Sequence, residues 1–155
     1  AHWRPFADFW TEAWRRSGPD ALGFTGATEE VVAELATREA FRARIGGPDR
    51  RMFLAWENDR VVGFAATRRV DAGTVELAGI VVLPSLSGRG IGTALLDAAV
   101  ARVGRDGYRS MTVRTETTNR PARAFYERRG FRALGTAVQQ VGDLPVEVWE
   151  LARSL

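Results

Sequence analysis

Apolar positions in this chain follow a helical period at the start and change to a shorter period later. Aromatic and small apolar residues recur every three or four positions from Phe6 to Arg16, and a similar repeat runs from Thr28 to Gly46. Both patterns predict amphipathic helices, the second with Thr28 as its N-cap. Ahead of them, we expect His2 to Pro5 to be the remainder of an edge strand.

After Gly47 the apolar runs become short, as in strands. Asn58-Asp59 joins the first two runs and is typical of a hairpin turn. Gly79 lies inside the third run, where it indicates a β-bulge or a close backbone approach. In chain order, we expect strands at 51–57, 60–70 and 74–83, a helix at 91–103, a strand at 108–114, a helix at 119–129 and a strand at 146–151. These elements predict an α/β (α+β) domain built around one mixed sheet.

Length and composition favour one globular domain over residues 1–155. The chain is 45% hydrophobic and 26% charged, and no apolar run approaches the roughly 18 residues of a membrane span. The first residues lack the apolar core of a signal peptide. We therefore expect a cytoplasmic protein with no membrane partner.

The residue types that are missing limit the chemistry. The sequence has no cysteine and no lysine, so its 22 basic residues are all arginine, and it has one histidine, His2. Thiolate nucleophiles, a Walker A lysine and a pyridoxal Schiff base are therefore excluded, and we expect no metal site. Carboxylates, tyrosine, arginine and backbone amides remain for catalysis.

The net charge of +3 and the pI of about 10.4 are compatible with a nucleic-acid partner or with an anionic cofactor. The arginines are scattered along the chain and form no basic run longer than a pair such as Arg50-Arg51. We therefore expect no nucleic acid, although a nucleic-acid-binding module stays open as an alternative.

The stretch from Ile80 to Thr93 reads as a strand, a glycine loop and the start of a helix. Glycines let the backbone approach a ligand closely, and the helix N-terminus adds free N–H groups and partial positive charge. This pattern predicts a phosphate cradle, with a purely structural turn as the alternative. A Rossmann fingerprint would need a third glycine at position 93, which is Thr93.

The same loop resembles motif A of the GNAT family of N-acetyltransferases, in which Arg or Gln is followed by any two residues, Gly, any residue, and Gly or Ala. The pattern falls on positions 87, 90 and 92, where Gly90 and Gly92 match and Ser87 replaces the usual Arg or Gln. The resemblance implies that the pantetheine arm of acetyl-CoA lies along the preceding strand. The implied acetyl-CoA-binding residues are Ile80, Val81, Val82, Ser87, Gly88, Arg89, Gly90, Ile91, Gly92 and Thr93.

A second segment, Asn119 to Phe131, is similar to motif B of that family, an Asn followed by Ala, Phe-Tyr and Gly-Phe. Its residues alone predict a helix capped by Asn119 and ended by Gly130. The two motifs together imply a GNAT-like acyl-CoA N-acyltransferase fold, with a central, mostly antiparallel sheet flanked by helices. They also imply that Asn119 and Tyr126 contact the cofactor. The resemblance extends from Arg51 to the C-terminus.

Acetyl transfer to an amine needs a proton acceptor, a stabilised oxyanion and a proton for the departing thiolate. The resemblance implies Glu76 as the base and Tyr126 as the acid, and we expect the Val81 N–H to polarise the carbonyl. A solvent-facing strand glutamate and a core tyrosine are the structural alternatives. The predicted function is acetyl transfer from acetyl-CoA to a primary amine of a small molecule or a protein N-terminus, and a homodimer is compatible with it. A non-catalytic acetyl-CoA-binding or regulatory domain remains the alternative.

The acceptor site is less defined by the sequence. Trp3, Phe6, Trp10 and Trp14 form an aromatic stripe on the first predicted helix. Such a stripe either walls an acceptor pocket or belongs to the core, and core packing is the more frequent use of this spacing.

Overall fold

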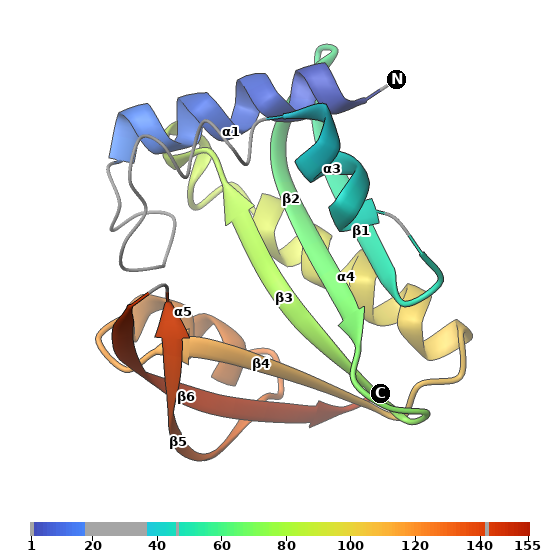
Figure 1. The fold of residues 1–155 in the computed structure, drawn as a ribbon, viewed down its shortest axis with the longest axis vertical. Helices are drawn as coiled ribbons and strands as arrows, with labels where there is room; N and C mark the ends of the chain where they lie inside the picture. The colour runs from blue at the N-terminus through green and yellow to red at the C-terminus, as the bar shows by residue number, and fades with distance from the viewer. Residues whose placement is uncertain (1, 18–36, 46, 142) are drawn as a thin grey trace.

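The computed structural model describes residues 2–17, 37–45, 47–141 and 143–155. A six-stranded sheet has helices α4 and α5 on one face and helices α1 and α3 on the other (Figure 1). The elements are α1 (Trp3–Ser17), α3 (Arg38–Ile45), β1 (Arg50–Glu57), β2 (Arg60–Arg69), β3 (Thr74–Val82), the 3₁₀ turn η2 (Pro84–Leu86), α4 (Ile91–Arg105), β4 (Ser110–Glu116), α5 (Arg120–Glu127), β5 (Arg132–Val141) and β6 (Leu144–Ser154). Among the described residues, no helix is both long enough and apolar enough to cross a membrane.

The strand order is β1-β2-β3-β4-β6-β5, and only the central β3–β4 pair is parallel. The mixed, mostly antiparallel sheet is therefore confirmed. The predicted hairpin is also confirmed, because Asn58 and Asp59 both have positive φ, 47° and 63°, as a two-residue primed turn between antiparallel strands requires.

An irregularity in β3 opens the middle of the sheet. The β2–β3 register passes from Ala66↔Gly79 to Thr67↔Leu77, so Ala78 is an extra residue in β3. This confirms the bulge predicted at Gly79. The parallel β3–β4 pairing ends at Leu77↔Val113, and beyond that point the two strands diverge (Figure 1).

Each face of the sheet carries its own apolar core. Under α4 and α5 the core contains Leu95, Leu96 and Val103 of α4. Under α1 it contains the aromatic stripe, in which Phe6 lies 5.4 Å from both Phe41 and Phe64, measured between ring centroids. Phe6 and Trp10 are thus buried in this core, and Trp10 also lines the cleft described below. Trp3 packs against the same core, and the side chain of Trp14 lies outside the described residues.

The predictions for the first fifty residues need two corrections. The edge strand expected at His2 to Pro5 is wrong, because α1 begins at Trp3 and Phe6 N donates to His2 O at 3.3 Å. A proline in a first helical turn lacks only an N–H that would have no partner there. The single helix expected from Thr28 is also wrong at its centre, since α3 begins at Arg38 behind a cap in which Thr37 Oγ1 accepts from Ala40 N at 3.1 Å. Thr28 itself lies outside the described residues.

Strand β5 was absent from the predicted elements, and the last strand was predicted too short. Both side-chain rows of β5 are largely exposed, so its sequence carries no apolar alternation. Its backbone pairs with β6 from Arg132↔Ala152 to Val141↔Leu144. Hydrogen bonding to a neighbouring strand, rather than burial, therefore defines β5.

Candidate functional site

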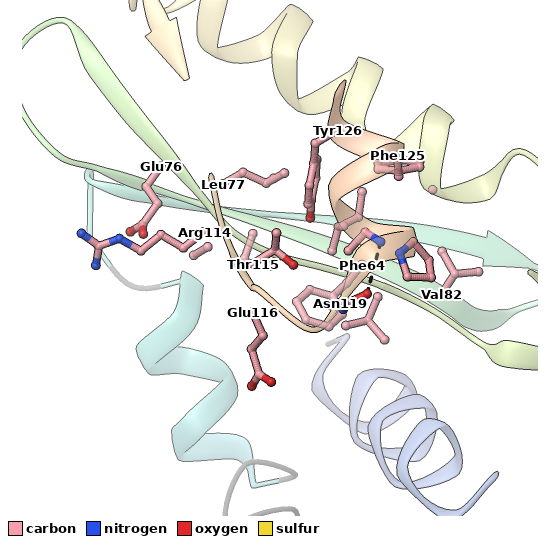
Figure 2. A pocket seen from close by; sticks show the side chains of 18 of the residues that line it. Phe64, Glu76, Leu77, Val82, Arg114, Thr115, Glu116, Asn119, Phe125 and Tyr126 are labelled. Atoms are coloured by element: carbon pink, nitrogen blue, oxygen red, sulfur yellow. Dashed lines mark hydrogen bonds between the residues drawn. The ribbon is translucent and has the colours of Figure 1, made fainter. Parts of the chain in front are cut away.

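A cleft of about 1150 Å³ opens between β3 and β4, where the two strands diverge. Figure 2 shows side chains from β2, β3, β4 and α5 arranged around it. Twelve of the thirteen predicted site residues line this cleft: Glu76, Ile80, Val81, Val82, Ser87, Gly88, Gly90, Ile91, Gly92, Thr93, Asn119 and Tyr126. The residues that the sequence placed far apart are therefore brought together.

The glycine loop forms one end of the cleft. Gly88 and Gly90 have φ of 80° and 83°, a conformation that favours glycine, and an added Cβ at either would meet no atom within 4 Å. Gly90 caps α4, so the first amides of that helix lie beside the cleft. Arg89, the thirteenth predicted residue, does not line the cleft, and its Nη2 lies 3.6 Å from Glu57 Oε1. The loop therefore offers backbone N–H donors to an anion, whereas the Arg89 side chain is directed toward Glu57 and away from the cleft.

The peptide groups of β3 form the wall beside the loop. Leu83 N donates to Val62 O at 2.9 Å, and hydrogen bonds between antiparallel strands recur at every second residue. Val81 therefore also faces β2, whereas the peptide groups of Ile80 and Val82 face the side from which β4 has diverged. We predicted that the Val81 N–H points into the opening, but it faces β2. The Ile80 N–H points into the opening instead.

Helix α5 supplies the opposite wall. Asn119 Oδ1 accepts from Ala122 N at 3.2 Å, so the predicted cap is confirmed and only the amide nitrogen of Asn119 is left to donate to a ligand. Tyr126 is 6% exposed, with its ring 5.4 Å from Phe125 and 5.5 Å from Phe131. Burial raises the pKa of Tyr126 to about 12. Figure 2 shows its hydroxyl directed into the cleft.

Glu76 enters the cleft from the other face of the sheet. Its neighbours Val75 and Leu77 lie in the core under α4, so the alternation of the strand puts Glu76 on the α1 face. Arg68 Nε donates to Glu76 Oε2 at 3.1 Å, and Arg68 Nη2 pairs with the same oxygen. Both contacts use Oε2, which leaves Oε1 for a water molecule or a substrate. On the same face, Arg114 Nη2 lies 2.8 Å from Glu150 Oε1.

Several residues of the cleft were not anticipated. They include Thr115 at the end of β4, Phe125 and Arg129 around α5, and Gln139 and Val148 on β5 and β6. Arg129 Nη1 donates to Phe125 O at 3.0 Å. Phe125 lies in the helix that was predicted from Asn119 to Arg129. The sequence carried no signal for Gln139, because β5 itself was not predicted. Among the described residues, no cluster of three acidic or histidine side chains is arranged to hold a metal ion.

Comparison with known proteins identifies the family. The sequence profile of the acetyltransferase (GNAT) family matches residues 5–131. The chain belongs to this family. The resemblance found in the two motifs is thus confirmed, and the GNAT match also covers most of the first helix.

Relatives and solved structures of GNAT proteins cover different shares of the chain. The uncharacterised N-acetyltransferase Rv2669 of Mycobacterium tuberculosis is 29% identical over 124 residues, which are 80% of this chain and 79% of that protein. The mycothiol acetyltransferase of Nocardiopsis dassonvillei is 44% identical over 80 residues, which are 50% of this chain but only 24% of that protein. A crystal structure of a GNAT-family acetyltransferase from Desulfovibrio desulfuricans superimposes with a TM-score of 0.73 at 25% identity, covering 96% of this chain and 92% of that one.

Proposed function

We propose that this protein is an N-acetyltransferase that binds acetyl-CoA in the β3–β4 cleft and transfers the acetyl group directly to a primary amine. The observation that carries the proposal is the pair of inward-facing peptide groups, Ile80 and Val82, beside a glycine loop at a helix N-terminus. A strand edge that has lost its neighbour can bind an extended, amide-containing chain such as pantetheine. Loop amides at a helix N-terminus favour a phosphate group.

Related proteins support the donor. The GNAT acetyltransferase of Elizabethkingia anophelis was crystallised with acetyl-CoA bound, and it has a TM-score of 0.64 to this chain at 18% identity. The relatives named mycothiol acetyltransferase and N-alpha-acetyltransferase 30 act, by their names, on different acceptors. The acceptor class is therefore proposed only as a primary amine, on a small molecule or a protein N-terminus.

The residues around the opening fit the three requirements of the reaction. In this proposal, the Ile80 N–H donates to the thioester carbonyl oxygen and stabilises the negative charge that develops on it. Glu76 Oε1, on the α1 face, accepts a proton from the attacking amine, directly or through water. The amine then approaches from the face of the sheet opposite α4 and α5.

Tyr126 is proposed to stabilise the departing thiolate with a hydrogen bond from its hydroxyl. The unperturbed pKa of a thiol is about 8.5, well below the value of about 12 to which burial raises the pKa of Tyr126, so complete transfer of the tyrosine proton to the thiolate is unfavourable. A hydrogen bond to a charged acceptor avoids this cost and contributes about 1.5–3 kcal/mol. We therefore propose the role of hydrogen-bond donor for Tyr126 in place of the general acid expected from the sequence.

Calorimetry with acetyl-CoA tests the binding site. Gly90→Glu places a carboxylate where the cofactor phosphates are expected, and Gly90→Ala is the matched control, because both variants introduce the same strain at a φ of 83°. We expect Gly90→Ala to bind acetyl-CoA within a few-fold of the wild type and Gly90→Glu to lose binding. Equal affinity of the two folded variants would contradict the assignment of the loop.

A screen of amine acceptors, followed by release of the coenzyme A thiol, then tests turnover. Release that depends on both acetyl-CoA and an amine supports the transferase. Binding of acetyl-CoA without turnover of any amine would favour the non-catalytic or regulatory alternative.

A further inference from the structure

Arg129 holds its guanidinium against the first turn of α4. Its Nη1 donates to Phe125 O at 3.0 Å, and its guanidinium carbon lies 3.8 Å from the centre of the Phe125 ring. Its Nη2 donates to the hydroxyl of Thr93, three residues after the cap Gly90. The side chain is partly buried, so these contacts fix a positive charge at the phosphate end of the cleft.

No carboxylate forms an ion pair with this charge within the part of the chain that the structure describes. Arg129 makes no ion pair there, and its Nε is buried without a hydrogen-bond partner. The nearby Arg153 adds a second cation, since its Nη1 donates to Arg129 O at 2.8 Å. Many other arginines do pair with carboxylates: Arg51, Arg60, Arg68, Arg69, Arg89, Arg102, Arg114 and Arg123. A partly buried cation without an anion is unfavourable unless a ligand supplies one.

The glycine loop, in contrast, lacks a positively charged side chain directed at the cleft. Ser87 brings no charge, and Arg89, the single cation between Ser87 and Thr93, is turned toward Glu57. Guanidinium groups bind phosphate oxygens with several directed N–H donors. We propose that Arg129, reaching over from the end of α5, binds a phosphate group of coenzyme A beside the loop amides. This inference rests on the proposed function, because it names a further contact of the same donor.

Coenzyme A offers two phosphate sites to Arg129, its pyrophosphate and its 3′-phosphate. Both present the same oxygen chemistry to a guanidinium, and 3′-dephospho-coenzyme A distinguishes them. A tenfold loss of affinity in Arg129→Gln that persists with 3′-dephospho-coenzyme A assigns the pyrophosphate. A loss that disappears with this ligand assigns the 3′-phosphate.

The experiment compares the coenzyme A affinity of the wild type, Arg129→Gln and Arg105→Gln by calorimetry. Arg105 lies at the far end of α4 and is exposed, so its variant makes the same charge change away from the cleft. We expect Arg129→Gln to weaken binding about tenfold or more and Arg105→Gln to change it less than about twofold, because a charged hydrogen bond is lost only in the first. Binding by Arg129→Gln within twofold of the wild type would overturn the inference.

Salt dependence separates phosphate binding from a merely structural link between α4 and α5. Affinity should fall with salt concentration more steeply in the wild type than in Arg129→Gln, because a direct charge contact is screened. A structural link would instead lower the melting temperature of the ligand-free variant and leave the salt dependence unchanged, which would overturn the inference. If Arg129→Gln does not fold, Arg129→Lys keeps the charge without the planar fork, and weakened binding is again expected. Failure of the wild type to bind coenzyme A would instead refute the proposed function.

Discussion

The substitution Tyr126→Phe removes one oxygen atom from a ring that is almost completely buried. The ring contacts Phe125 and Phe131 and belongs to the core under α4. Phenylalanine keeps the shape of the ring, so the free energy of unfolding at neutral pH should change by less than about 1.5 kcal/mol. The informative effect of the substitution appears at alkaline pH.

Burial of the Tyr126 hydroxyl makes the wild type sensitive to alkaline pH. The pKa of this group is 10.0 when exposed and about 12 in the folded protein. Above pH 10 the unfolded chain loses the proton while the folded chain keeps it, so the free energy of unfolding falls as the pH rises. At 1.36 kcal/mol per pH unit the loss begins near pH 10 and approaches roughly 3 kcal/mol above pH 12.

Few other side chains of this protein titrate between pH 10 and pH 12. The sequence has no lysine and no cysteine, arginine as a class stays protonated throughout this range, and Tyr108 is the only other tyrosine. Denaturant unfolding at pH 8 to 11.5 should show stability falling above pH 10 in the wild type and in Tyr108→Phe, but much less in Tyr126→Phe. A parallel decline of the wild type and Tyr126→Phe would refute the assignment of the raised pKa to Tyr126.

The same substitution tests the proposed hydrogen bond to the thiolate. Loss of one hydrogen bond to a charged acceptor should lower kcat about 10- to 100-fold, with little change in the acetyl-CoA KM. The pH–rate profile of the wild type should show no ionisation of tyrosine below pH 10, because the proton stays on the oxygen. A kcat within threefold of the wild type, when chemistry is rate-limiting, would make Tyr126 a core residue only.

Two further predictions concern β3 and β2. Glu76→Gln should lower kcat/KM most at low pH, where unprotonated amine is scarcest. The control Glu127→Gln, at an exposed position, should leave the pH–rate profile unchanged. If Glu76→Gln and the wild type have identical pH–rate profiles, Glu76 has no part in the mechanism. Gly63→Ala should destabilise the fold by about 1–3 kcal/mol in chemical denaturation, because its Cβ would lie 3.0 Å from Leu95 Cδ1. Gly104→Ala, the control, has open space around its Cβ and should be neutral or stabilising.

The sequence predicts elements well where burial and period agree. The α4 helix shows this, because Leu95, Leu96, Ala99 and Val103 repeat at helical spacing and are all buried against the sheet. Strand β5 shows the opposite case. Leu134 and Val138 are 70% and 67% exposed, so no apolar face marks the strand, and its pairing with β6 places it in the sheet.

The sequence predicted most of the residues that meet at the glycine-loop end of the cleft, but not the directions in which their side chains and peptide groups point. Glycine positions and helix caps are local properties, so Gly90 and Asn119 could be placed from the sequence. The orientation of Val81 depends on where the bulge in β3 falls, and a glycine narrows that location without fixing it. Arg129 depends on a contact with Thr93, 36 positions away in the chain, which no local pattern encodes.

The bulge at Ala78 shows how, in the proposed reaction, one opening can serve both substrates. In a regular strand, Leu77 would share its face with residues 79, 81 and 83, but the extra residue moves Ile80 and Val82 to that face instead. The same shift turns the peptide groups of Ile80 and Val82 toward the side that β4 leaves open. Glu76, before the bulge, stays on the α1 face, while Tyr126 and the glycine loop lie on the α4 face. In the proposed reaction, thioester and amine therefore approach from opposite faces and meet where β3 and β4 separate. We expect a change that restored the β3–β4 pairing to abolish acetyl transfer without altering Glu76 or Tyr126.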